Sequence, residues 1–154
     1  MSMEIQAALD VADETDSFLQ ITDIIYDKEA DLGYNDLSAS EKVIYCIDGL
    51  LREVENGGFV QFFRQDAGAY AEDTLLALEA IKAKDSQAVF QSVLNLFPNA
   101  QVPSDENARL ELFEHIESDQ ADTLSELDEQ FHETGENLVA LSLNYVQKNL
   151  KNFK

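Results

Sequence analysis

Two histidines and one cysteine are the side chains in this sequence best suited to acid–base, metal or nucleophilic chemistry. Histidine titrates near neutral pH and is the commonest metal ligand, and Glu129 with His132 has the Glu-x-x-His spacing of di-iron sites in helical bundles. Such a site needs that step twice, but Leu112 occupies the position that would pair with His115. Cys46 lies on the apolar face of the most clearly predicted helix, where a free cysteine acts as a small hydrophobic residue. We therefore expect no catalytic, metal or cofactor site and no enzyme activity.

Carboxylates are far more abundant than any other ionisable group. The chain has 31 Asp and Glu against 10 Lys and Arg, and its formal net charge is −21. Residues 1–36 hold ten acids and one lysine, and residues 104–136 hold twelve acids and one base, Arg109. This charge disfavours direct binding to nucleic acid or to an anionic membrane surface. It favours a partner that is itself basic.

Within residues 104–136, five acids are spaced by four, three, four and three positions. This spacing places them on one face of a helix, opposite Leu124, Leu127 and Phe131, if the segment is continuous. With a rise of 1.5 Å per residue, one carboxylate would lie about every 5 Å along that face. The stripe predicted to bind a partner consists of Asp122, Glu126, Glu129, Glu133 and Glu136.

Two further rows of acids are predicted to support this stripe. Rows that lie side by side would approach the linear charge density of duplex DNA, one charge per roughly 1.7 Å of axis. The second row, on the preceding helix, consists of Asp105, Glu114 and Glu117. The third row, on the first helix, consists of Asp16, Asp23 and Asp27. Whether residues 119–136 form one helix or two is left open at this stage.

Apolar residues at helical spacing predict the elements that position these acids. The clearest pattern runs from Val43 to Val54, with a capping box at Ser38 and Glu41 before it and Asn56-Gly57-Gly58 as its stop. Other helices are expected over 13–30, around 59–63, 71–78, 85–97, 104–116, 124–131 and 138–145, with Asp85 or Ser86 and Ser104 as N-caps. Period-2 alternation is nearly absent. The predicted fold is all-α, with six to eight helices.

Length and composition fit a single domain that spans all 154 residues. One cysteine excludes an internal disulfide and fits a reducing compartment. The longest apolar run, Val43 to Ile47, is far shorter than the roughly 20 residues that cross a membrane. The N-terminus does not have the pattern of a signal peptide. We therefore expect a cytoplasmic protein.

The stretch from Glu53 to Phe63, with its Glu-Val-x-Asn-Gly-Gly-Phe core at 53–59 and Gly68 after it, is similar to a known signature. It resembles that of the bacterial acidic DNA-mimic proteins first named in Neisseria, and the likeness covers about residues 37–97. The resemblance implies an all-helical and often dimeric protein. It also implies a protein that occupies the DNA-binding surface of a transcription factor and thereby acts as an anti-repressor.

The sequence leads to one main hypothesis for function. The chain is expected to be a non-enzymatic acidic protein that regulates transcription by blocking the DNA site of a basic DNA-binding protein, such as a helix-turn-helix regulator. A homodimer is also expected from the resemblance. Three alternatives stay open: a structural or assembly protein whose charge only provides solubility, an immunity-type inhibitor of a basic nuclease toxin, and an enzyme with an unfamiliar site, which a cluster of perturbed carboxylates in a deep pocket would favour.

Overall fold

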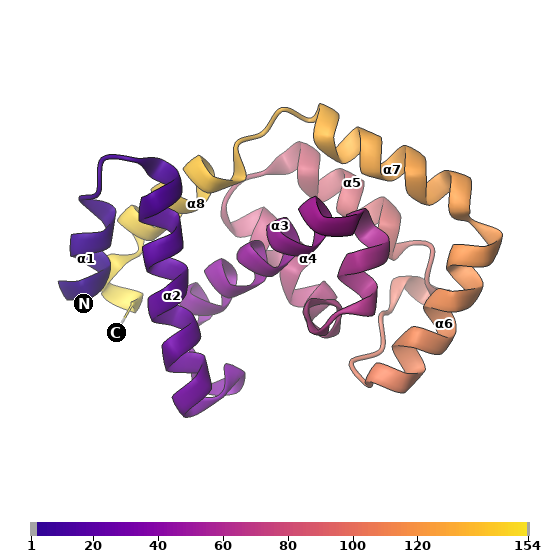
Figure 1. Cartoon of the computed structure of the whole chain (residues 1–154), viewed down its shortest axis with the longest axis horizontal. Helices are drawn as coiled ribbons and strands as arrows, with labels where there is room; N and C mark the ends of the chain where they lie inside the picture. Colours follow the sequence, from indigo (N-terminus) through magenta and orange to yellow (C-terminus); the bar gives the residue numbers. More distant parts are fainter. Residues whose placement is uncertain (1–2, 154) are drawn as a thin grey trace.

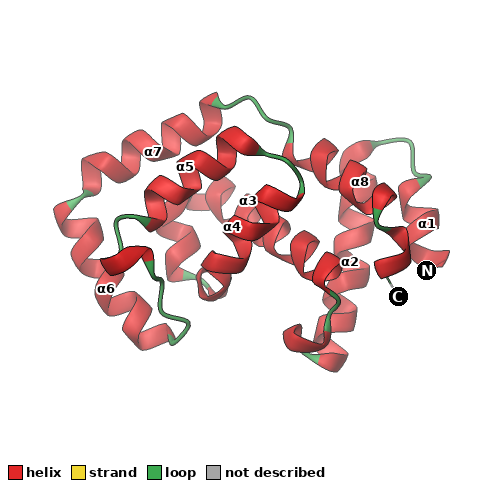
Figure 2. Cartoon of the chain, turned by 180° about the vertical axis from the view of Figure 1, so that it is seen from behind, coloured by secondary structure: helices red, strands yellow, loops and turns green. Residues whose placement is uncertain are grey.

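The computed structural model describes residues 3–153, and the predicted all-α fold is confirmed. This part of the chain contains eight α-helices and four short 3₁₀ turns, with no strand (Figures 1 and 2). The helices are α1 (Met3–Leu9), α2 (Glu14–Leu32), α3 (Ala39–Arg64), α4 (Ala71–Ala80), α5 (Lys84–Leu94), α6 (Glu106–Asp119), α7 (Ala121–Glu133) and α8 (Leu138–Lys148).

The long helix α3 lies at the centre and contacts α2, α4, α6, α7 and α8. The predicted capping box begins it: the Ser38 hydroxyl accepts from the Glu41 amide, and the Glu41 carboxylate accepts from the Ser38 amide. Gly57 and Gly58 interrupt the helix with non-helical backbone angles, as the sequence suggested, but the chain returns at once to a helical path that ends at Arg64.

Phenylalanine rings fill the core around the second half of α3. Phe59, Phe62 and Phe63 have no exposed surface. The rings of Phe63 and Phe113, on α6, lie 5.3 Å apart, and those of Phe59 and Phe131, on α7, lie 5.4 Å apart. These aromatic contacts fix α6 and α7 on the central helix.

Helix α1 was not predicted from the sequence. Its Ile5 and Ala8 are buried, and the Ser17 hydroxyl of α2 donates to the Ala8 carbonyl at 2.8 Å. With only seven residues, α1 offers too little helical periodicity to stand out. Figure 1 places it at the same end of the molecule as α2 and α8. Across residues 3–153, no helix is both long and apolar enough to cross a membrane.

Two predicted N-caps were wrong. Helix α6 is capped by Asp105 rather than Ser104, because the Asp105 carboxylate accepts from the Ala108 amide at 2.9 Å. Helix α5 begins at Lys84 with Ala83 at its N-cap, so neither Asp85 nor Ser86 is in the capping position. The amides of Asp85 and Ser86, in the first turn of α5, instead donate to the carboxylate of Glu136, about fifty positions later in the chain.

Candidate partner-binding surface

The two acidic segments lie at opposite ends of the molecule. Helix α2 packs against α1, α3 and α8, whereas α6 and α7 form the far end of the longest axis (Figure 1). Asp16, Asp23 and Asp27 are exposed on α2. They therefore form a separate patch, and the prediction that they supply a third row beside the α7 stripe is wrong.

Helices α6 and α7 follow the outer edge of the molecule one after the other. The helical pattern breaks at Gln120, so residues 119–136 are not one helix. The two helices meet at this break and then diverge, since α6 packs on α3 and on the 3₁₀ turn Asp66–Tyr70 while α7 packs on α5 and α3 (Figures 1 and 2). Their acids therefore do not form the two adjacent rows that were predicted.

Four of the five predicted stripe residues lie on α7 as expected. Asp122, Glu126, Glu129 and Glu133 are all exposed. The opposite face of α7 is buried through the side chains of Leu124, Leu127 and Phe131. At a rise of 1.5 Å per residue, these four carboxylates span about 16 Å of helix.

Glu136 does not belong to the stripe. Helix α7 ends at Glu133, and Gly135 follows with a φ of 68°. The Glu136 carboxylate turns towards α5, where it accepts from the Ser86 amide at 2.7 Å and from the Asp85 amide at 3.2 Å. These are first-turn amides with no partner inside their own helix. Glu136 is therefore the N-terminal acceptor of α5, and its role in the fold is structural.

We predict that Glu136→Ala lowers the free energy of unfolding by about 1 kcal/mol at pH 7, because two helix amides lose their acceptor. Burial acts in the opposite direction, but the hydrogen bonds from Ser86 and Asp85 lower the pKa of Glu136 below its usual 4.5. A lowered carboxyl pKa stabilises the fold above the unfolded-state value, and this contribution is lost as the pH falls through the folded-state value.

Urea unfolding at pH 7 and pH 3 measures this effect, and Glu133→Ala is the control because Glu133 is an exposed acid three residues away. The control variant is expected to stay within about 0.5 kcal/mol of the wild type. The penalty of Glu136→Ala should shrink at pH 3. Equal stability of the two variants at pH 7 would contradict the capping role.

The predicted second row is only partly available to a partner. Glu114 is exposed, and Asp105 is exposed although its carboxylate also caps α6. Glu117 is half-buried and forms an ion pair with Arg64 of α3. Helix α6 also carries exposed acids that were not predicted as partner-binding residues. We name the exposed carboxylates of the two helices the acidic edge: Asp105, Glu106, Glu111, Glu114, Asp119, Asp122, Glu126, Glu129 and Glu133.

Arg109, the one base of this segment, is not on the surface. It is 1% exposed, and its guanidinium donates to the carbonyls of Phe63, Pro103 and Ser104 at 3.1–3.4 Å. The Phe63 carbonyl belongs to the last turn of α3, where a helix favours a positive charge. No lysine or arginine between residues 104 and 136 is therefore exposed among the carboxylates of the acidic edge.

Asp128 positions α7 and was missed in the sequence. Its carboxylate accepts from the Phe59 amide at 2.9 Å, just after the glycine pair that interrupts α3. Burial raises the pKa of Asp128 above its usual value, although the Phe59 amide and nearby His132 oppose the rise. Asp128 could have been recognised from its position in the sequence. It falls on the apolar face of α7, between Leu124 and Phe131, where a buried carboxylate needs a hydrogen-bond partner.

His115 and His132 are both exposed, and Cys46 is buried. Burial raises the pKa of the Cys46 thiol to about 11, so the thiol is protonated near neutral pH. In the described residues, no three His, Cys, Asp or Glu side chains come close enough together to hold a metal ion.

Comparison with known proteins adds one match. The family model described as DMP19-like protein, where DMP19 stands for DNA mimic protein 19, matches residues 35–149. The match covers α3 to α8 and therefore the whole acidic edge. No curated protein and no solved structure matches the chain.

Proposed function

Because this chain belongs to the DMP19-like protein family, we propose that it acts as a non-enzymatic mimic of DNA. In this proposal, the acidic edge occupies the DNA-binding surface of a basic protein, such as a helix-turn-helix regulator, and blocks its access to DNA. The observation that carries the proposal is the acidic edge itself: nine exposed carboxylates on two successive helices, with the only base of the segment buried.

The arrangement of α6 and α7 supports phosphate mimicry more than simple solubility. Like charges three and four residues apart on a helix destabilise it by a few tenths of a kcal/mol per pair, and an ordinary exposed helix relieves this with interleaved lysines. Helix α7 has no lysine or arginine. A protein that binds DNA phosphates would associate with such a surface quickly, and its affinity for the acidic edge would fall as the salt concentration rises.

The same proposal places the protein in the cytoplasm, in contact with the bacterial DNA-binding proteins that it would inhibit. The regulator is expected to be released from its operator when the acidic protein is present. Transcription of the genes that the regulator represses would then increase.

We predict that the double reversal Glu126→Lys/Glu129→Lys weakens binding of the partner by about tenfold or more, because two attractive contacts become repulsive. The matched control is Glu72→Lys/Glu79→Lys on α4, which changes the net charge equally at two exposed acids outside the acidic edge. The control is expected to change affinity by less than about threefold.

The wild-type protein is first used to retain partners from lysate of the source organism at low salt. Bound proteins are eluted by a salt gradient and challenged with duplex DNA, and the affinities of both double variants for the purified partner are then measured. The proposal expects a basic DNA-binding protein that DNA displaces. Retention of a single nuclease toxin without an effect on any regulator would overturn it, as would equal affinities of the two double variants.

A further inference from the structure

A groove crosses the middle of the molecule between its two acidic ends. One hollow of about 350 Å³ lies between α2, α3 and the start of α8, and a second of about 250 Å³ lies between α3, the end of α7 and α8. The two hollows adjoin, because Leu51, Glu55 and Val139 line both. We name this surface, from Leu19 on α2 to Phe131 on α7, the central groove.

The hollow beside α2 is mainly apolar and partly open to solvent, whereas the hollow at the end of α7 has both apolar and polar side chains in its lining. Leu19 is 50% exposed, so its apolar side chain is open to solvent at the edge of the hollow beside α2. Leu51 and Val139 are half-buried between the two hollows. Apolar surface of this kind gains free energy when a partner covers it.

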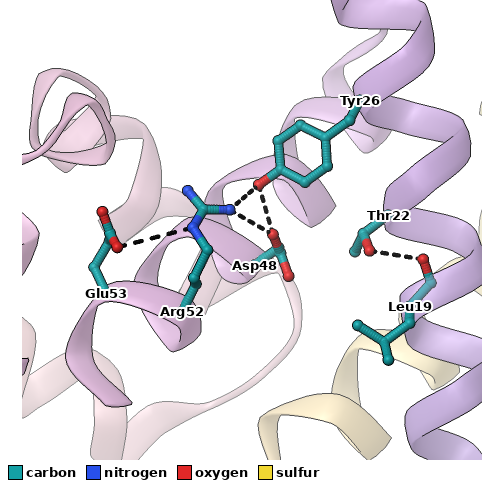
Figure 3. A network of polar contacts seen from close by, with 6 residues as sticks. All are labelled: Leu19, Thr22, Tyr26, Asp48, Arg52 and Glu53. Atoms are coloured by element: carbon teal, nitrogen blue, oxygen red, sulfur yellow. Dashed lines mark hydrogen bonds and ion pairs between the residues drawn. The ribbon is translucent and has the colours of Figure 1, made fainter. Parts of the chain in front are cut away.

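The charged residues along the central groove leave a net negative rim. Its one arginine, Arg52, already has partners: its Nη1 lies 3.0 Å from an Asp48 oxygen and 2.6 Å from the Tyr26 hydroxyl, and its Nε lies 3.8 Å from Glu53 (Figure 3). Asp23 and Glu55 are exposed on the rim. The groove therefore offers apolar side chains, chiefly in the hollow beside α2, with carboxylates on its rim.

We propose that the central groove binds a basic amphipathic helix of the partner protein. Apolar side chains on one face of that helix would enter the two hollows, and lysine or arginine side chains beside them would reach Asp23 and Glu55. This inference rests on the proposed function, since it concerns the same partner, but it assigns a second surface with different chemistry. A surface that only imitates phosphates would not provide apolar contacts to the partner.

A helix fits the geometry of the groove. An amphipathic helix presents apolar side chains at positions i, i+3, i+4 and i+7, which suits two adjoining hollows along α3. Because Asp23 and Glu55 on the rim are negatively charged, the groove favours a helix with lysine or arginine beside its apolar face. The acidic edge attracts any basic protein, whereas a groove that requires an apolar face discriminates among them. The central groove would thus supply specificity, and the acidic edge would supply attraction.

The experiment uses the full chain and two fluorescent synthetic peptides of equal composition. One peptide, of about 18 residues of Leu and Lys, places all leucines on one helical face, and the other has the same residues in scrambled order. The wild-type protein is expected to bind the amphipathic peptide at least about fivefold more tightly than the scrambled one. Leu19→Gln should remove most of this preference.

The matched control is Leu32→Gln. Leu32 lies on the same helix, is 52% exposed and does not line either hollow. Both variants should keep the wild-type melting temperature, because both changes are at exposed positions. Equal binding of the two peptides by the wild type, or equal behaviour of the two variants, would overturn the groove proposal.

These outcomes are independent of the test of the acidic edge. If the peptides are not distinguished but Glu126→Lys/Glu129→Lys still loses the DNA-displaceable partner, the groove proposal fails and DNA mimicry stands. If Leu19→Gln loses the amphipathic peptide while the charge reversal has no effect on any DNA-binding protein, the groove binds helices and the proposed function fails.

Discussion

Gly58→Ala is expected to destabilise the protein by about 3 kcal/mol. Gly58 has φ 68° and ψ −164°, a region of backbone space that is essentially restricted to glycine. A Cβ atom at this position would lie 2.6 Å from the Asp128 Oδ2 atom, so the Asp128 carboxylate would have to shift. Backbone strain of this kind costs about 1–3 kcal/mol, and the hydrogen bond from Phe59 to Asp128 would weaken as the carboxylate shifts.

Urea unfolding of Gly58→Ala is compared with that of Gly135→Ala, at a second glycine with a positive φ. Gly135 also has a φ of 68°, but no atom lies within 4 Å of a Cβ built there. Its substitution should therefore cost only the backbone strain, about 1 kcal/mol. If both variants lose the same free energy of unfolding, the close approach of Asp128 to Gly58 contributes nothing.

The interruption of α3 at Gly57 and Gly58 shows which structural features local sequence can predict and which depend on distant residues. The Asn56-Gly57-Gly58 stop could be predicted because left-handed backbone angles favour glycine locally. The return to helix at Phe59 depends on Asp128, 69 residues away, whose carboxylate accepts from the first amide after the interruption. Periodicity describes each helix by itself, and it does not identify which distant side chain completes the end of a helix.

The same distinction explains the outcome for the acidic residues. The α7 stripe from Asp122 to Glu133 follows from helical spacing alone, so four of its members were placed correctly. Glu136 was misplaced, although Gly135 is a typical residue just after a helix end and could have been recognised as a stop. That the α2 acids lie far from α7 could not be foreseen, because it depends on how the helices pack around α3.

A buried cation contributes to the packing of α6, beside the aromatic contacts of Phe113. Arg109 reads in the sequence as the lone base of an acidic surface helix, yet it is buried against the end of α3. Gly68 makes this possible, because a Cβ there would lie 3.1 Å from the Arg109 Nε atom and 2.9 Å from the Phe62 carbonyl. Arg109 therefore helps to hold α6, and with it half of the acidic edge, against the end of α3.

We predict that Arg109→Met lowers the free energy of unfolding by about 3 kcal/mol. Methionine has a similar length but no donor, so the carbonyls of Phe63, Pro103 and Ser104 would be left without the guanidinium that they bind. A lost hydrogen bond to a charged group costs about 1.5–3 kcal/mol, and the new apolar contacts of methionine offset part of the total.

Arg64→Met provides the control, since Arg64 is exposed and pairs with Glu117 on the surface. An exposed ion pair contributes about 0–1 kcal/mol, so this variant should stay close to the wild type in urea unfolding. A penalty for Arg109→Met no larger than that for Arg64→Met would show that the buried cation is not what holds α6. If the penalty is large, the position of α6 and of its carboxylates depends on the burial of Arg109.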